Sequence, residues 1–184
     1  VDGSFFVSSA AVNPALTSRL AIAIPGIAIA IAVVAIGGAP FALVLAAIGV
    51  LGLYEFYSLT AAQRPLRWAG YVGAILVILL AWGYDPGERG IVLGLGISLL
   101  LVAVAGLILP RRDEITVRMG STLLGVIYLG LPLGLLVLTR ELPHGAAAVV
   151  NVLVGVWVFD TASYVGGRLW GSTPIAPRTS PKKT

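Results

Sequence analysis

Long apolar stretches set the limits on what this sequence can fold into. Six of them follow one another, at residues 20–36, 40–59, 68–83, 90–109, 119–138 and 146–165. Each approaches the ~20 residues that a helix needs to cross the hydrocarbon core of a bilayer. The connectors are short, so we expect consecutive helices to be antiparallel neighbours with no water-soluble domain between them. The sequence therefore predicts an all-α polytopic transmembrane bundle of about six spans.

The composition excludes an ordinary water-soluble domain. Of the 184 residues, 58% are hydrophobic and 11% are charged, and the mean hydropathy is +1.00. Cysteine is absent, which removes disulfides and thiolate metal sites from consideration. The formal net charge is +4, but membrane proteins concentrate Lys and Arg in cytoplasmic loops, and this explains the excess more simply than a nucleic-acid partner. We therefore predict no nucleic-acid partner.

The basic residues orient the predicted bundle. If the amino terminus is cytoplasmic, only Arg89 and Arg140 lie outside. The other ten lie inside: Arg19, Arg64, Arg67, Arg111, Arg112, Arg118, Arg168, Arg178, Lys182 and Lys183. An even number of spans also returns the end of the chain to the cytoplasm. We thus predict an amino-terminal segment (1–19), a six-span region (20–165) and a cytoplasmic basic segment (166–184).

One carboxylate lies inside the last apolar stretch. On a helix, Asp160 shares a stripe with Ser163, Tyr164 and Gly167. A carboxylate facing lipid would be costly, so Asp160 must face protein, water or a cation. If the span ends near Val165, Asp160 lies ~7–8 Å below its cytoplasmic end, at 1.5 Å per residue. The alternative to a functional role is that Asp160 pairs with an arginine or caps a neighbouring helix.

The segment after Asp160 supplies groups that suit phosphate binding. Its cations and a hydroxyl can contact phosphate oxygens: Arg168, Arg178, Ser180, Lys182 and Lys183. A carboxylate followed by such groups indicates a divalent metal on Asp160, with a polyphosphate lying against the basic segment. The alternative is that these cations only set topology or bind anionic lipid.

Two motifs in this region resemble a known family. DTASYVGGRLWG, followed by APRTSPKKT, resembles the D-x-x-A-Y-x-x-G-R-x-x-G and A-P-x-x-S-P-K-K-T segments of phosphatidate cytidylyltransferases, the CDP-diacylglycerol synthases of phospholipid synthesis. The earlier spans resemble the family only in number, order and general character. Members of that family continue after SPKKT into a further membrane half, so this chain resembles an amino-terminal portion.

The resemblance implies a reaction and a location. CMP would pass from CTP to phosphatidate, giving CDP-diacylglycerol and pyrophosphate, at the cytoplasmic face of a bacterial inner membrane. Asp160 would be a catalytic residue that binds Mg²⁺, with room for a second cation. Residues beyond Thr184 would complete the site, so we expect this portion alone to have little or no activity.

The resemblance also implies roles for the basic segment. Lys182 and Lys183 would be catalytic contacts to phosphate or pyrophosphate, and Arg178 and Ser180 would bind the same anion. Arg168 is a candidate for the lipid phosphate, and Tyr164 is a further candidate for substrate binding. CTP, phosphatidate and membrane lipids are the partners expected.

Two other functions fit the same predicted arrangement of transmembrane helices. A kinase of a long-chain lipid alcohol would share the metal requirement but release a nucleoside diphosphate. A scaffold or transporter module would use Asp160 for packing or ion passage. Glu55 either helps to line a polar cavity or pairs with Arg64 or Arg67.

Small residues also indicate helix contacts. We expect Gly90-x-x-x-Gly94 and Gly130-x-x-x-Gly134 to lie between packed helices. Homo-oligomers that form through such small-residue faces are also expected.

Overall fold

The computed structural model describes residues 14–84, 87–108 and 114–171, and every regular element in these ranges is helical. The α-helices are α1 (Pro14–Ile36), α2 (Gly38–Leu59), α3 (Arg67–Gly83), α4 (Gly87–Ile108), α5 (Ile115–Gly125), α6 (Leu131–Glu141) and α7 (Gly145–Trp170). Two short elements join them: a 3₁₀ turn, η1 (Ala61–Gln63), and a π-helical turn, η2 (Val126–Gly130). The prediction of an all-α chain is confirmed for these residues.

Each of the six predicted apolar stretches falls largely within a helix. By length and composition, four helices in the described ranges can cross a membrane: Gly38–Leu59, Gly87–Ile108, Ile115–Glu141 and Gly145–Trp170. Ala23–Ile36 and Arg67–Gly83 are apolar but shorter. These helices make the chain an integral membrane protein, while six complete crossings stay a prediction.

The fifth apolar stretch is one continuous helix with a widened turn in the middle. The elements α5, η2 and α6 follow one another without a break from Ile115 to Glu141. Pro132 is the second residue after η2 and has no N–H to donate to the preceding turn. The π-helical turn relieves the clash that the proline ring would cause with the carbonyl four residues earlier.

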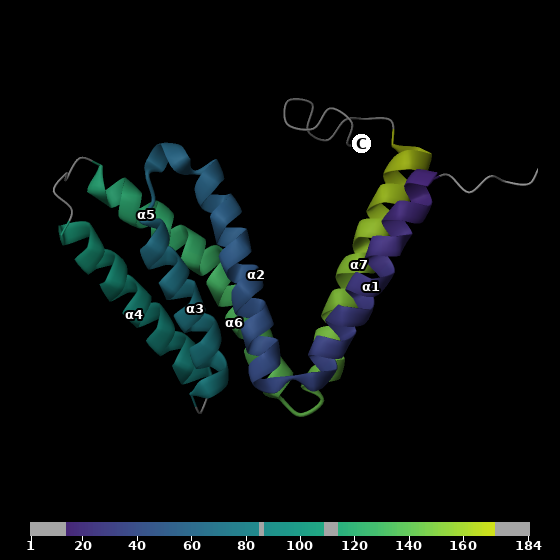
Figure 1. Ribbon diagram of the computed structural model, residues 1–184, viewed down its shortest axis with the longest axis horizontal. Coiled ribbons are helices and arrows are strands. Elements are labelled where there is room, and N and C mark those ends of the chain that lie inside the picture. The colour runs from purple at the N-terminus through teal and green to yellow at the C-terminus, as the bar shows by residue number, and fades with distance from the viewer. Residues whose placement is uncertain (1–13, 85–86, 109–113, 172–184) are drawn as a thin grey trace, which may run out of the picture.

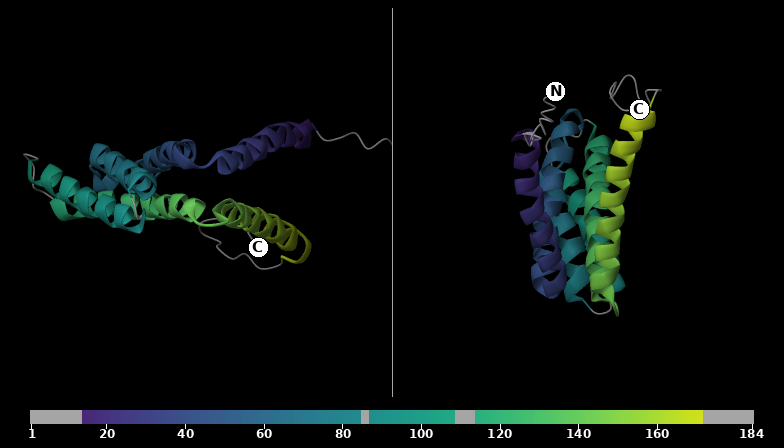
Figure 2. Two further views of the ribbon diagram at one scale, coloured as in Figure 1. Left: turned by 90° about the horizontal axis from the view of Figure 1, so that it is seen from below. Right: turned by 90° about the vertical axis from the view of Figure 1, so that its right-hand side faces the viewer.

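The helices form two arms that meet at one end (Figure 1). The helices α2 to α6 make a bundle, and α1 and α7 make a second arm that splays away from it. Figure 2 shows that the start of α1 and the end of α7 lie at the same end of the molecule. Val34 of α1 and Val149 of α7 join the main core cluster, so the second arm is attached where the arms meet.

Glycines let the bundle helices approach α3 closely. A Cβ at Gly94 would lie 2.7 Å from Val77 Cα, and one at Gly130 would lie 3.1 Å from Ala74 Cα. Gly90 faces the Leu80 carbonyl in the same way, and Gly134 faces Val77. Both predicted glycine pairs are therefore helix contacts, and α3 lies between them.

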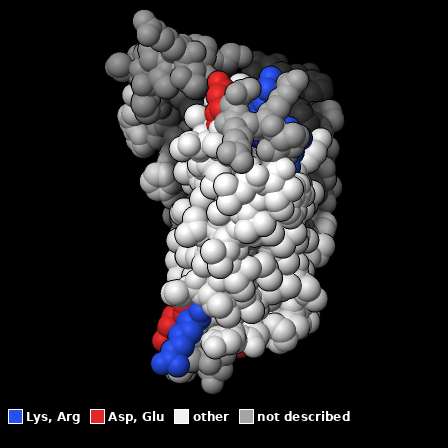
Figure 3. Space-filling view, turned by 90° about the vertical axis from the view of Figure 1, so that its left-hand side faces the viewer, with Lys and Arg blue, Asp and Glu red and all other residues white. Residues whose placement is uncertain are grey.

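Charged side chains gather at the two ends of the bundle, as Figure 3 shows for one face. Because the helices alternate in direction (Figure 1), Arg64, Arg67 and Arg118 lie at one end and Arg89 and Arg140 at the other. This is the separation that the sequence predicted, although which end is cytoplasmic stays a prediction.

Two adjacent residues at the end of α6 fix the corner between α1 and α2. Arg140 donates from Nε to the Val34 carbonyl at 2.6 Å and from Nη2 to the Ala35 carbonyl at 3.0 Å. Glu141 Oε1 accepts the Gly38 amide at 3.3 Å. A cation thus satisfies carbonyls at the end of α1, and a carboxylate satisfies an amide at the start of α2. We call these two residues the corner clamp.

Candidate functional site

The predicted site residues that the structure describes all lie on α7. This helix is buried only at Gly145 and Val149, close to its start. Beyond that point it stands clear of the bundle (Figure 1). The second half of α7 is therefore accessible from the opening between the two arms.

Asp160 is exposed on this part of α7. It forms no hydrogen bond or ion pair with any described residue, so it neither pairs with an arginine nor caps a helix there. Because α7 is helical from Gly145 to Trp170, Asp160 does share a stripe with Ser163, Tyr164 and Gly167, as predicted. The carboxylate is thus available to a ligand.

Tyr164 and Arg168, about one and two turns beyond Asp160, are brought together on α7. Arg168 Nη1 donates to Tyr164 Oη at 3.4 Å, and both side chains are exposed. The helix continues through Gly166 and Gly167 to Trp170, past the predicted end of the span at Val165. Arg168 therefore projects from the same helix as Asp160, whereas the sequence placed it in a following segment.

Four predicted contacts lie outside the described residues. These are Arg178, Ser180, Lys182 and Lys183. Their proposed roles stay predictions.

The side chains that could donate oxygen or nitrogen to a metal ion show whether a magnesium ion fits near Asp160. Among the described residues, no group of three or more His, Asp or Glu side chains could hold a metal ion. Magnesium is usually bound through one or two carboxylates, with phosphate and water oxygens supplying the rest. Asp160 fits as one such carboxylate, because it is exposed and forms no hydrogen bond or ion pair with a described residue.

Glu55 lies on α2, the helix that borders the opening on the side of the bundle (Figure 1). It is exposed on α2 and forms neither of the predicted pairs. Arg67 Nη2 instead donates to the Tyr57 carbonyl at 3.2 Å, and the Arg64 carbonyl accepts from Arg118 Nε at 3.0 Å. The side chains of Arg67 and Arg118 thus bind backbone carbonyls of the bundle, and Glu55 has no partner among the described residues.

A buried polar tie that the sequence did not reveal holds the end of the bundle. Tyr57 Oη donates to the Thr122 carbonyl at 2.7 Å, and Thr122 Oγ1 accepts the Leu66 amide at 2.7 Å. Gly70 and Gly125 leave room for the Tyr57 ring. Gly70 and Gly125 are the sequence features that could have indicated this contact. They indicate it only once α3 and α5 are known to flank α2.

Comparison with known proteins identifies the family. The sequence profile of the Cytidylyltransferase family matches residues 17–184. The chain belongs to the cytidylyltransferase family. The resemblance drawn from the two motifs is thereby confirmed.

The curated relatives that this cytidylyltransferase-family chain matches are named phosphatidate cytidylyltransferases. It is 32% identical over 155 residues to a phosphatidate cytidylyltransferase of Brucella suis, covering 81% of this chain and 53% of the relative. For that of Pseudomonas aeruginosa the identity is 29%, with 80% and 55% covered. For that of Bacillus subtilis it is 24%, with 82% and 58% covered.

The chain spans about half the length of the curated relatives it matches. No solved structure matches it. The match to the family therefore covers almost the whole chain. The activity of the longer relatives is proposed for this chain below.

Proposed function

We propose that this chain is the part of a phosphatidate cytidylyltransferase that carries a metal-binding carboxylate and the start of the phosphate-binding segment. The observation that carries the proposal is Asp160. It is a carboxylate without a partner among the described residues, exposed on the half of an apolar helix that stands clear of the bundle, in a chain of the cytidylyltransferase family. The names of the relatives support phosphatidate and CTP as the substrates.

The reaction is an in-line displacement at phosphorus. A phosphate oxygen of phosphatidate attacks the α-phosphorus of CTP, forming one P–O bond. The bond between the α-phosphorus and its bridging oxygen breaks, and pyrophosphate leaves with the electron pair. The products are CDP-diacylglycerol and pyrophosphate, and no covalent protein intermediate is needed.

The residues of this chain bind and orient the two anions. Asp160 would hold Mg²⁺, which supplies positive charge to the phosphates when it is bound. Arg168, held by Tyr164, would contact the lipid phosphate. Lys182 and Lys183 would contact the phosphates of CTP, and Arg178 and Ser180 would bind the same group. The complete site would also use residues from the further length that the relatives have.

The proposal includes an orientation and a setting. Both ends of the chain, and with them the end of α7, would lie on the cytoplasmic side of a bacterial inner membrane, where CTP is found. The ten basic residues at that predicted end support this orientation. Homo-oligomers are proposed as well, and the small residues of the helices would allow them.

The direct test is product formation in nanodiscs from phosphatidate, CTP and Mg²⁺. The protein is expressed to its natural stop codon and compared with its Asp160→Asn variant and with the 184-residue chain. We expect CDP-diacylglycerol and pyrophosphate from the unaltered protein, and a loss of ~100-fold or more from Asp160→Asn. The 184-residue chain should have little or no activity.

A matched control separates the role of Asp160 from a general loss of charge. Glu88 is an exposed carboxylate near the start of α4, at the opposite end of the bundle. Glu88→Gln should keep full activity. If a well-folded protein releases neither product, the assignment fails. Release of a nucleoside diphosphate from a lipid alcohol would establish the kinase instead, and no nucleotide chemistry at all would leave the scaffold or transporter.

A further inference from the structure

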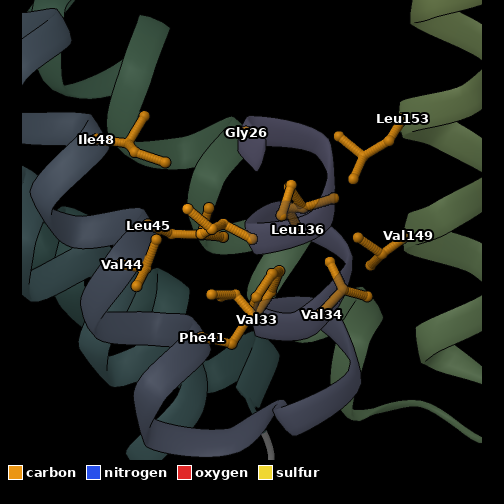
Figure 4. Close-up of a pocket in the computed structure, with 12 residues that line it drawn as sticks. Gly26, Val33, Val34, Phe41, Val44, Leu45, Ile48, Leu136, Val149 and Leu153 are labelled. Carbon is orange, nitrogen blue, oxygen red and sulfur yellow. The ribbon is translucent and has the colours of Figure 1, made fainter. Parts of the chain in front are cut away.

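The two arms enclose an apolar cavity of about 270 Å³ just above the point where they meet (Figure 4). Its lining comes from four helices, α1, α2, α6 and α7, and every lining residue is apolar. Ile48 of α2 and Leu153 of α7 line its upper part, and Ala30 lines it from α1. An apolar cavity of ~150 Å³ is enough to bind benzene, so this one has room for a flexible hydrocarbon segment but none for a helix.

The cavity and Asp160 lie on the same face of α7. Leu153 precedes Asp160 by seven residues and Val149 precedes it by eleven. These separations are close to two and three turns of a helix, so all three side chains share one stripe. The face of α7 that closes the cavity therefore leads directly to the carboxylate.

The helix α2, on the other side of the cavity, has the same spacing between a lining residue and a carboxylate. Ile48 precedes Glu55 on α2 by seven residues as well. Counted at 1.5 Å per residue from the start of each helix, Glu55 is ~25 Å along α2 and Asp160 is ~22 Å along α7. The apolar surface of both walls thus gives way to a carboxylate at nearly the same height.

An apolar cavity with a carboxylate farther along each of two lining helices fits an amphipathic molecule of defined length. Leu153 and Val149 lie ~10 Å and ~16 Å along α7 from Asp160. One leaflet of a bilayer contributes about half of its ~30 Å hydrocarbon core, which is the depth that an acyl chain reaches. A lipid with its headgroup level with Asp160 would therefore place the end of one acyl chain in the cavity.

We propose that the cavity between the two arms is an acyl-chain subsite for the phosphatidate substrate. This inference rests on the proposed function, because it identifies the headgroup above the cavity as the one that reacts. Asp160 and Glu55 would repel the lipid phosphate in the absence of a cation, so binding is tested with Mg²⁺ present. The subsite selects a chain long enough to reach from the carboxylates to the cavity.

The experiment uses phosphatidate with a photoreactive diazirine near the methyl end of one acyl chain. The lipid is placed in nanodiscs with the protein expressed to its natural stop codon, irradiated without CTP, and the labelled peptides are mapped by mass spectrometry. We expect label to concentrate on the cavity-lining parts of α1, α2 and α7. Phosphatidylcholine carrying the same tail should label them ~10-fold less.

Two matched pairs of variants keep the result interpretable. Ala30→Phe fills the cavity from α1, whereas Ala28→Phe places the same ring on the opposite, exposed face of that helix. Leu153→Trp and Val158→Trp make the same comparison on α7, where Val158 is 61% exposed. The cavity-filling member of each pair should reduce cavity labelling ~10-fold, and its partner should leave it unchanged.

The outcomes separate this subsite from the reaction itself. Label spread evenly over the apolar surface, or equal labelling by phosphatidylcholine, would overturn the subsite even if CDP-diacylglycerol is made. Selective labelling that only the cavity-filling variants abolish would support it even if the assay of the proposed function fails. If one cavity-filling variant does not fold, the pair on the other helix decides.

Discussion

At the scale of single residues, the structure leaves no buried polar side-chain atom unpartnered within the described ranges. Thr122 shows how this is achieved. Its side chain is fully buried, donates from Oγ1 to the Arg118 carbonyl at 2.7 Å and accepts the Leu66 amide. One hydroxyl thus satisfies a helical carbonyl and an amide at the start of α3.

Replacing Thr122 by Val should destabilise the protein. Valine has a similar shape but leaves the buried Leu66 amide without an acceptor, which costs ~1–3 kcal/mol. Thr122→Ser keeps the hydroxyl and should lose less. Thermal unfolding of both variants in one detergent measures the difference. Equal stability of the Val and Ser variants would show that the hydroxyl is not needed.

Single residues were predictable from the sequence when their chemistry conflicts with their surroundings. Asp160 was identified because a carboxylate in an apolar stretch needs a reason to be there. Tyr57 and Thr122 were not, because a tyrosine near a helix end and a threonine in a helix conflict with nothing. Their contact spans 65 positions of sequence and depends on how α2 and α5 are placed.

At the scale of elements, close helix pairs depend on glycine. The approach of α4 to α3 at Gly94 is set by backbone, since the nearest atom to an added Cβ is Val77 Cα. Backbone cannot move aside as the end of a flexible side chain can. The two helices would have to separate to admit even a methyl group.

Gly94→Ala should therefore destabilise the bundle by ~1–3 kcal/mol, the usual cost of overpacking. Gly96→Ala is the control, because an added Cβ there meets nothing within 4 Å. On helix propensity alone, both substitutions would be stabilising. Chemical denaturation in the same detergent compares them, and equal midpoints would mean that α3 and α4 are not packed as described.

The helices themselves were predictable, but their ends were not. Apolar length fixed the position of all six stretches, and short connectors predicted antiparallel neighbours. The glycine pair Gly166 and Gly167 was placed after the last span, yet α7 continues through both to Trp170. Glycine lowers helix propensity by only ~1 kcal/mol, so it permits an end without imposing one.

At the scale of the whole molecule, the separation of the arms was not predictable from the sequence. Every helix is apolar on most of its surface, so hydrophobic pattern alone does not say which faces meet. The arrangement depends on specific contacts at the joined end, among them the core residues Val34 and Val149 and the corner clamp.

Removing the corner clamp should loosen the attachment of α1. Arg140→Ala deletes two charged hydrogen bonds to the last turn of α1, each worth ~1.5–3 kcal/mol. Hydrogen exchange of the Gly37 amide, which donates to the Val33 carbonyl, should accelerate ~10-fold or more. Arg89→Ala removes an exposed cation at the same end and should leave that exchange unchanged. Unaltered exchange in Arg140→Ala would show that the corner holds without the clamp.

The corner clamp also has a consequence for membrane insertion during synthesis. The helices α1 and α2 leave the ribosome before α6, and the groups that cap their shared corner follow 106 and 103 positions later. Until the end of α6 has been translated and has entered the bilayer, the turn between α1 and α2 lacks its partners. The helix α1 would thus be positioned first by lipid and only later by the end of α6, so its final placement is a late event in biogenesis.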